Sequence, residues 1–173
     1  MTFAYSNFLA KVKEKGLAVQ NRFQVVFSQP ACFEWFGLSD ISLMCKSVSV
    51  PGVNVATSSE RIIGEVREIP YDRNFGAANL TFWVNSQFDT REYFERWIDG
   101  IQNPNTRILS YYNDIKTDVV ITTLNKMDEP VFETKLYAAH PKSIGQLSLD
   151  NESTGAMTLD VTFDYHHYSM KKL

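Results

Sequence analysis

The chain has 173 residues, with 17 Lys and Arg against 20 Asp and Glu, and a formal net charge of -3. Hydrophobic residues make up 44% and charged residues 21%, a balance typical of folded proteins and unlike that of disordered chains. The small acidic excess argues against strong nucleic-acid binding, which normally needs a basic surface. We expect one domain over residues 1–173, with neither a transmembrane helix nor a signal peptide.

The N-terminal segment predicts a helix over residues 1–16. Its apolar residues Tyr5, Phe8, Leu9 and Val12 recur at the spacing of one helical face. A helix this short is marginal alone. We therefore expect its apolar face to dock either on its own domain or on a neighbouring subunit.

Strand signals follow. Residues 22–28 alternate between polar and apolar side chains, and residues 80–85 do the same. Residues 41–50 are also β-prone, but the apolar positions change parity midway, which predicts a bulge or a bend near Lys46.

An unusually long connection separates these strands. Between residues 53 and 69 the chain is polar, with isolated aliphatic residues. It is either a disordered loop or a projecting hairpin whose apolar residues contact a partner. A segment that is only solvated rarely keeps so many aliphatic side chains, so the hairpin is favoured, within an extended segment over residues 46–72.

The strongest helical signal covers residues 89–102. Asp89 and Glu92 have the spacing of a capping box, which would start the helix at Asp89. An apolar face follows, and Asn103-Pro104 ends the helix because proline cannot continue the hydrogen-bond ladder. The residues of this face are Phe94, Trp97, Ile98 and Ile101.

The C-terminal half is rich in strands. Residues 117–124 and 131–138 predict a hairpin, with Phe132, Thr134, Leu136 and Ala138 on one face, and residues 144–149 predict a short strand. The clearest alternation in the chain runs from Met157 to Tyr165. The fold class is therefore mainly β (α+β): two packed antiparallel sheets in a barrel or sandwich, with a flanking helix, an N-terminal helix and a long projecting hairpin loop.

Chemistry-bearing motifs are missing from the sequence. No nucleophile elbow, P-loop or dinucleotide fingerprint is present, and Cys32 and Cys45 predict two free thiols in a reducing compartment. His166 and His167 are adjacent in a predicted strand, so they should point to opposite faces and not share a metal. Asp160 and Asp164 share a face but lie about 13 Å apart, too far for a paired acid and base. We therefore expect no catalytic, cofactor or metal site, and no enzymatic activity.

Several longer runs, in this order and spacing, are similar to the tail tube proteins of T4-like contractile-tailed bacteriophages. The resemblance covers nearly the whole chain. The runs are SVPG at 49–52, ER at 60–61, REIPYDR at 67–73, LTFWVN at 80–85, FDTREYFERWIDGIQNP at 88–104, SYYNDI at 110–115, YAAHPKSIGQLSLD at 137–150 and VTFDY at 161–165.

The resemblance implies a structural virion protein. Copies would form hexameric rings that stack into the inner tube of a contractile tail, a channel for genome ejection. The implied partners are other copies, the tail sheath, the baseplate or tube initiator and the tail terminator, while tape measure protein and DNA pass through without specific binding. A baseplate tube initiator or a related injection-system tube subunit remains the alternative. The implied location is the virion, assembled in the host bacterial cytoplasm.

Two sets of residues are candidates for roles in such a tube. The aliphatic residues of the extended segment are candidates for ring stacking, because burial against the next ring would remove them from water. They are Val53, Val55, Ile62, Ile63, Val66 and Ile69. Asp160 and Asp164 are candidates for an acidic lumen lining, which would repel phosphates and let DNA slide.

Overall fold

The computed structural model describes residues 9–10, 12–13, 19–35, 37–61, 64–152 and 154–173. The helix expected over residues 1–16 lies largely outside these residues. None of the helices in the described part of the chain has the length and hydropathy of a membrane span.

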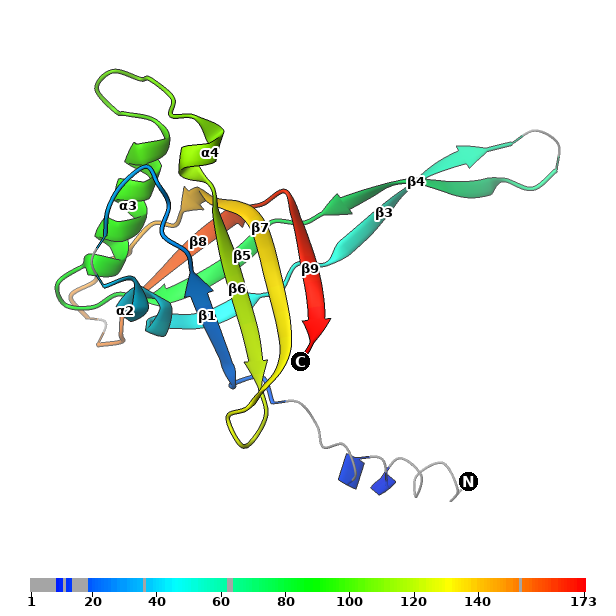
Figure 1. Cartoon of the computed structure of the whole chain (residues 1–173), viewed down its shortest axis with the longest axis horizontal. Coiled ribbons are helices and arrows are strands. Elements are labelled where there is room, and N and C mark those ends of the chain that lie inside the picture. Colours follow the sequence, from blue (N-terminus) through cyan, green and yellow to red (C-terminus); the bar gives the residue numbers. More distant parts are fainter. Residues whose placement is uncertain (1–8, 11, 14–18, 36, 62–63, 153) are drawn as a thin grey trace.

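Two antiparallel sheets share one long strand (Figure 1). The strand β7 (Pro130–Ile144) pairs in its first part with β6 (Thr117–Leu124) and β9 (His167–Lys172), and in its last part with β8 (Thr158–Asp164). β1 (Phe23–Phe27) adds to β6 and completes the first sheet.

The second sheet extends from β8 through β5 (Ala78–Trp83) to β2 (Cys45–Ser49). β1 and β2 are therefore the last strands of the hydrogen-bonded order, and no ladder among the described residues joins them. The two packed antiparallel sheets confirm the expected class, while the expected barrel is not closed by hydrogen bonds.

The core lies between the sheets and under α3 (Asp89–Ile101). Phe27, Phe82, Phe94 and Phe163 come from both sheets and from the helix, and their rings lie 4.9–6.4 Å apart. Aromatic rings at these separations bury a large area and add a favourable edge-to-face term. This cluster therefore packs α3 against residues of both sheets.

The helix α3 begins differently from the expected capping box. The residue before it, Phe88, is left-handed, and no side chain caps the helix at that position. Instead, Asn85 accepts a hydrogen bond from the Asp89 amide at 2.9 Å and donates to the Asp89 carboxylate at 2.6 Å. The capping-box prediction is therefore wrong in its residues, although the helix starts at Asp89 as expected and ends one residue early, at Ile101.

Two other local predictions need correction, and a third is confirmed. Residues 41–43 belong to the short helix α2 (Leu38–Leu43), which follows a left-handed Gly37, and the strand starts only at Cys45. The bulge expected near Lys46 is confirmed, because the β2–β5 register shifts between Cys45 and Ser47. No strand covers residues 145–149, since β7 itself continues to Ile144.

Ala138 marks the bend of β7. Its φ is 54°, and the β6–β7 register shifts between Thr117 and Val119, opposite this point. The shift turns Ala139 into the core and leaves Ala138 only half-buried, contrary to the expected face. A bulge of this kind bends a strand, which lets β7 serve both sheets.

Candidate assembly surfaces

The long connection forms a projecting hairpin of β3 (Val53–Glu60) and β4 (Arg67–Phe75) (Figure 1). The expected hairpin is therefore confirmed for its described residues, while the contact of its apolar residues with a partner stays a prediction. The two strands pair with each other and with no other described strand. Every residue of the two strands is exposed except Ala56 and Phe75, which are half-buried. The hairpin therefore presents both faces and both edges to solvent.

The expected stacking residues do not lie in one stripe. Val53 and Val55 share a hairpin face with Phe75, because cross-strand partners share a face. Ile69 pairs with Ser58 and faces the other way. The side chains of Val53, Val55 and Ile69 are 39–55% exposed, and Val66, near the turn, is 57% exposed. Ile62 and Ile63 lie outside the described residues.

Tyr71 is an apolar residue of the hairpin that the aliphatic pattern missed. It is 71% exposed, more than any of the expected residues described, and it is the unpaired residue of the bulge between Ala56 and Thr57 on the opposite strand. An exposed aromatic ring is a common anchor in protein interfaces. Tyr71 belongs to the run 67–73, which is one of those that carry the family resemblance. The alternation of polar and apolar residues, however, did not distinguish it from its neighbours.

An aromatic cluster fixes the root of the hairpin. Phe75 packs on Tyr165 and Tyr168, with ring centroids 6.3 and 5.4 Å away. The Tyr165 hydroxyl donates a hydrogen bond of 2.6 Å to the Gly76 carbonyl, directly after β4. Burial, with the nearby Tyr168 and Asp164, raises the pKa of Tyr165, so this donor stays protonated at neutral pH. The base is therefore held to the body, while the distal part pairs with no other strand among the described residues.

The expected acidic pair lies on the outer face of β8. Leu159, Val161 and Phe163 point into the core, so the intervening residues point outward. Asp160 is exposed and accepts a hydrogen bond of 2.6 Å from the Thr81 hydroxyl. Asp164 is half-buried, and Lys142 Nζ lies 3.6 Å from its carboxylate. The two carboxylates share a surface, with one of them partly neutralised.

A second polar cluster on the other sheet escaped the sequence patterns. Asp118 on β6 contacts Lys135 Nζ on β7 at 2.9 Å and accepts from the Ala138 amide at 3.3 Å. Burial disfavours the charged carboxylate, but these two hydrogen bonds, together with the charge of Lys135, hold the pKa of Asp118 below its ordinary value. Lys135 also lies 4.8 Å from the centre of the Tyr137 ring, which stacks on His167 at 4.4 Å.

The histidine pair is arranged differently from the expectation. A bend follows β8, and β9 begins at His167, so His166 and His167 do not alternate within one strand. Their rings lie edge to face with centroids 5.3 Å apart. The expected opposite orientation is therefore wrong, but no group of three potential metal ligands exists among the described residues.

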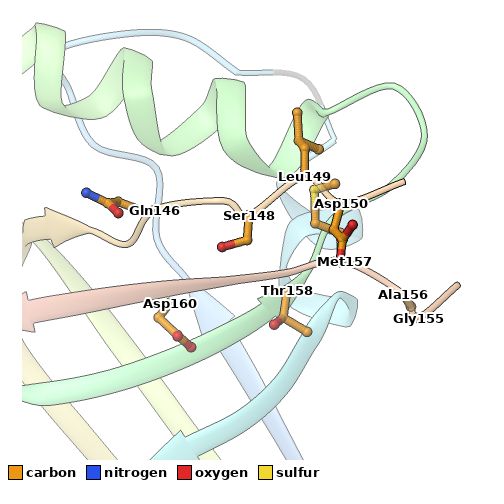
Figure 2. Close-up of a pocket in the computed structure, with 9 residues that line it drawn as sticks. All are labelled: Gln146, Ser148, Leu149, Asp150, Gly155, Ala156, Met157, Thr158 and Asp160. Atoms are coloured by element: carbon orange, nitrogen blue, oxygen red, sulfur yellow. The ribbon is translucent and has the colours of Figure 1, made fainter. Parts of the chain in front are cut away.

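A polar hollow of about 360 Å³ lies beside the first residues of β8. Figure 2 shows Thr158 and Asp160 on that strand, with Gln146, Ser148 and Asp150 on the segment that follows β7. Asp150 and Asp160 are the titratable residues of its lining. Among the described residues, the lining contains no histidine, cysteine or lysine.

Both cysteines are free and half-buried. Burial raises the pKa of the Cys45 thiol to about 12, and burial also raises the pKa of Cys32. Cys32 packs against α3 where a side chain at Gly100 would approach its sulfur to 3.0 Å. Both thiols are therefore protonated at neutral pH. This is the state of cysteines that serve in packing, whereas a reactive cysteine is a thiolate.

The arrangement of strands is found in solved structures from contractile injection systems. A chain from the baseplate of the anti-feeding prophage, in a six-fold symmetrised structure, is 21% identical, with a TM-score of 0.69 over 90% of this chain and 95% of that chain. A chain from the sheath-tube complex of an extracellular contractile injection system is 20% identical, with a TM-score of 0.67 over 95% and 97%. An Hcp protein is 16% identical, with a TM-score of 0.52 over 87% and 89%.

The fold is therefore one that occurs in the tubes and baseplates of contractile injection systems. A family model described as "Phage tail tube protein" matches residues 18–171, and the chain belongs to this family. A search of curated proteins finds no match.

Proposed function

We propose that copies of this chain form six-membered rings that stack into the inner tube of a contractile tail, with a structural and non-catalytic role. The observation that carries the proposal, beyond family membership, is the projecting hairpin. Its aliphatic residues and Tyr71 are exposed, and a soluble monomer gains nothing from holding them in water.

Ring-on-ring stacking gives this hairpin a role. A contact between two different surfaces of identical copies repeats without closing, so it builds an open polymer along the tube axis. Val53, Val55, Val66, Ile69 and Tyr71 would leave water on the next ring, and Ile62 and Ile63 are included in the proposal. Within a ring, the free edges of β1, β2 and β9 are the candidates for contacts between neighbours.

The lumen proposal concerns charge. DNA carries a dense negative charge, so an acidic lining repels it and lets it slide without counterion release. We propose that Asp160 and Asp164 belong to that lining. Replacing both with lysine should leave tube formation intact and make isolated tubes retain DNA at low salt. If tubes of this variant form equally well and do not retain DNA, Asp160 and Asp164 do not line the lumen.

The proposed partners follow from the same assembly. Sheath, baseplate or initiator and terminator proteins would contact the tube, while tape measure protein and DNA would pass through it. The particle would be a virion assembled in the host cytoplasm, or a related injection apparatus. One of the similar chains comes from a baseplate, which favours a tube initiator as the second candidate. Copy number in purified particles separates the two: many rings for a tube, one or a few for an initiator.

A hairpin deletion tests the stacking role. Val53 and Phe75 are cross-strand partners, so a short flexible Gly-Ser linker between them closes the shortened chain and keeps both root residues. We expect this variant to form single rings or monomers under conditions where the intact chain forms tubes in electron micrographs. Normal tubes from the shortened chain would refute the hairpin's role, and an intact chain that stays monomeric at all concentrations would refute the tube itself.

A further inference from the structure

The two edges of the hairpin differ in their protection against strand pairing. β3 has seven consecutive uncharged residues, from Val53 to Ser59, before Glu60. β4 carries Arg67, Glu68, Asp72 and Arg73, and it also contains Pro70. Charges and proline on an edge strand are the devices by which proteins prevent pairing with another strand. β4 has both, and β3 has neither along most of its length.

The proline defines which backbone groups face outward. Thr57 is paired with Pro70, which has no N–H to donate across the ladder, so this is a pair of the non-hydrogen-bonded kind. Both residues therefore turn their backbone groups away from each other. Since the pattern alternates, Ser59 and its partner Glu68 do the same. The outer edge of β3 thus presents the N–H and C=O groups of Thr57 and Ser59. The outer edge of β4 lacks an N–H donor at Pro70.

The free edge of β3 is also the continuation of a longer one. β2 is the last strand of its sheet, and Val50–Gly52 connect it to β3. Their partner strands, β5 and β4, are likewise consecutive in the chain. The unpaired edges of β2 and β3 therefore lie on the same side of the chain. Along this side, neither β2 nor β3 pairs with another strand among the described residues.

We propose that the outer edge of β3 pairs, through its backbone, with an edge strand of a second copy of this chain. This deepens the proposed stacking function and rests on it. A second copy is the occupant because the chain itself has further unpaired strand edges, and because one repeated contact between different surfaces of identical copies produces an open polymer. Backbone pairing gives the contact its affinity, and Val53, Val55 and Tyr71 add apolar burial.

Residue-resolved hydrogen exchange on the intact chain tests the proposal. The amides of Thr57 and Ser59 are compared in free subunits and in assembled tubes, and they should exchange more slowly in tubes by at least about tenfold. The Glu68 amide, on the opposite edge of the same hairpin, should not slow. Protection of Glu68 instead, or rapid exchange of Thr57 and Ser59 within formed tubes, overturns the proposal. Protection that requires an added second protein overturns the choice of partner.

A matched pair of proline variants gives an independent readout. Ser59→Pro and Glu68→Pro alter two residues that face each other across the hairpin, so they disturb it equally, but they remove an N–H from opposite edges. Ser59→Pro should abolish tubes in electron micrographs while Glu68→Pro retains them. Normal tubes from Ser59→Pro, or loss of tubes in both variants, overturns the assignment to one edge. An unaltered chain that never stacks refutes the proposed function instead, so the two failures are distinguishable.

Discussion

Trp97 on α3 tests whether this helix is part of the subunit's own core. Its side chain is fully buried, and its ring lies 5.8 and 5.9 Å from those of Tyr93 and Phe163. The indole nitrogen donates a hydrogen bond of 2.9 Å to the carbonyl of Ile115, where α4 (Tyr112–Ile115) leads into β6. Trp97 thus joins the helix to the sheets in two ways.

The expected cost of Trp97→Ala is about 3–5 kcal/mol, because a large cavity remains and the Ile115 carbonyl loses its donor. With a urea m-value of about 2 kcal/mol/M, this lowers the unfolding midpoint by about 1.5–2.5 M. Trp97→Phe keeps a ring but loses the N–H, so about 1–2 kcal/mol is expected.

Urea unfolding followed by far-ultraviolet circular dichroism measures these changes. The protein must be dilute enough to be monomeric, because assembly would add to the apparent stability. Trp83→Ala is the matched control, since Trp83 is 37% exposed and has Lys46 Nζ 4.5 Å from its ring centre; a clearly smaller loss than for Trp97→Ala is expected. If Trp97→Ala lowers the free energy of unfolding by less than about 1 kcal/mol at an unchanged m-value, α3 is not part of the monomer's core.

Three further predictions concern single groups. Ala138→Gly should raise the stability of the monomer in urea by about 0.5–1 kcal/mol, because glycine adopts a φ of 54° without a Cβ penalty; a loss of stability would refute the strain argument. The pKa of Asp118 is lower in the folded than in the unfolded protein. Its contribution to stability is therefore present above the unfolded-state pKa and is lost as the pH falls through the folded-state pKa. Asp118→Asn should flatten the acid limb of a curve of stability against pH, and an unchanged limb would refute the lowered pKa of Asp118. Because the pKa of Cys45 is about 12, alkylation by iodoacetamide at pH 8 should be much slower in the native than in the urea-unfolded protein, and equal rates by mass spectrometry would contradict it.

The sequence predicted elements whose periodicity matches their own burial. The alternation from Met157 to Tyr165 is such a case, since Leu159, Val161 and Phe163 are fully buried. The face of α3 was partly misplaced. Thr90 and Tyr93 are fully buried with Phe94 and Trp97, and these four residues follow the same helical spacing one turn earlier than the expected face. That signal was present, but the polar atoms of Thr90 and Tyr93 concealed it.

Other features depend on contacts between distant segments. The helix α2 replaces the first part of a β-prone run, where tertiary packing of Ile41 outweighs local strand preference. The bend at His166 separates β8 from β9, and β9 exists because β7 offers it a partner along Phe132–Tyr137. Single-sequence alternation cannot detect such partners. For the assembly surfaces, the aliphatic residues indicated the hairpin, but only the register revealed that they occupy both of its faces.

The construction of the hairpin has a consequence for the proposed assembly. A two-stranded ribbon is only marginally stable in water, and here the anchoring contacts of Phe75 are confined to the root. Ordering the distal strands on a partner costs conformational entropy, which lowers the affinity of a single contact. Six such contacts in one ring would act together, because once one hairpin docks the others are held near their sites. Isolated subunits would then bind one another weakly while a completed ring binds firmly, so growth from an existing ring is favoured over association of free subunits.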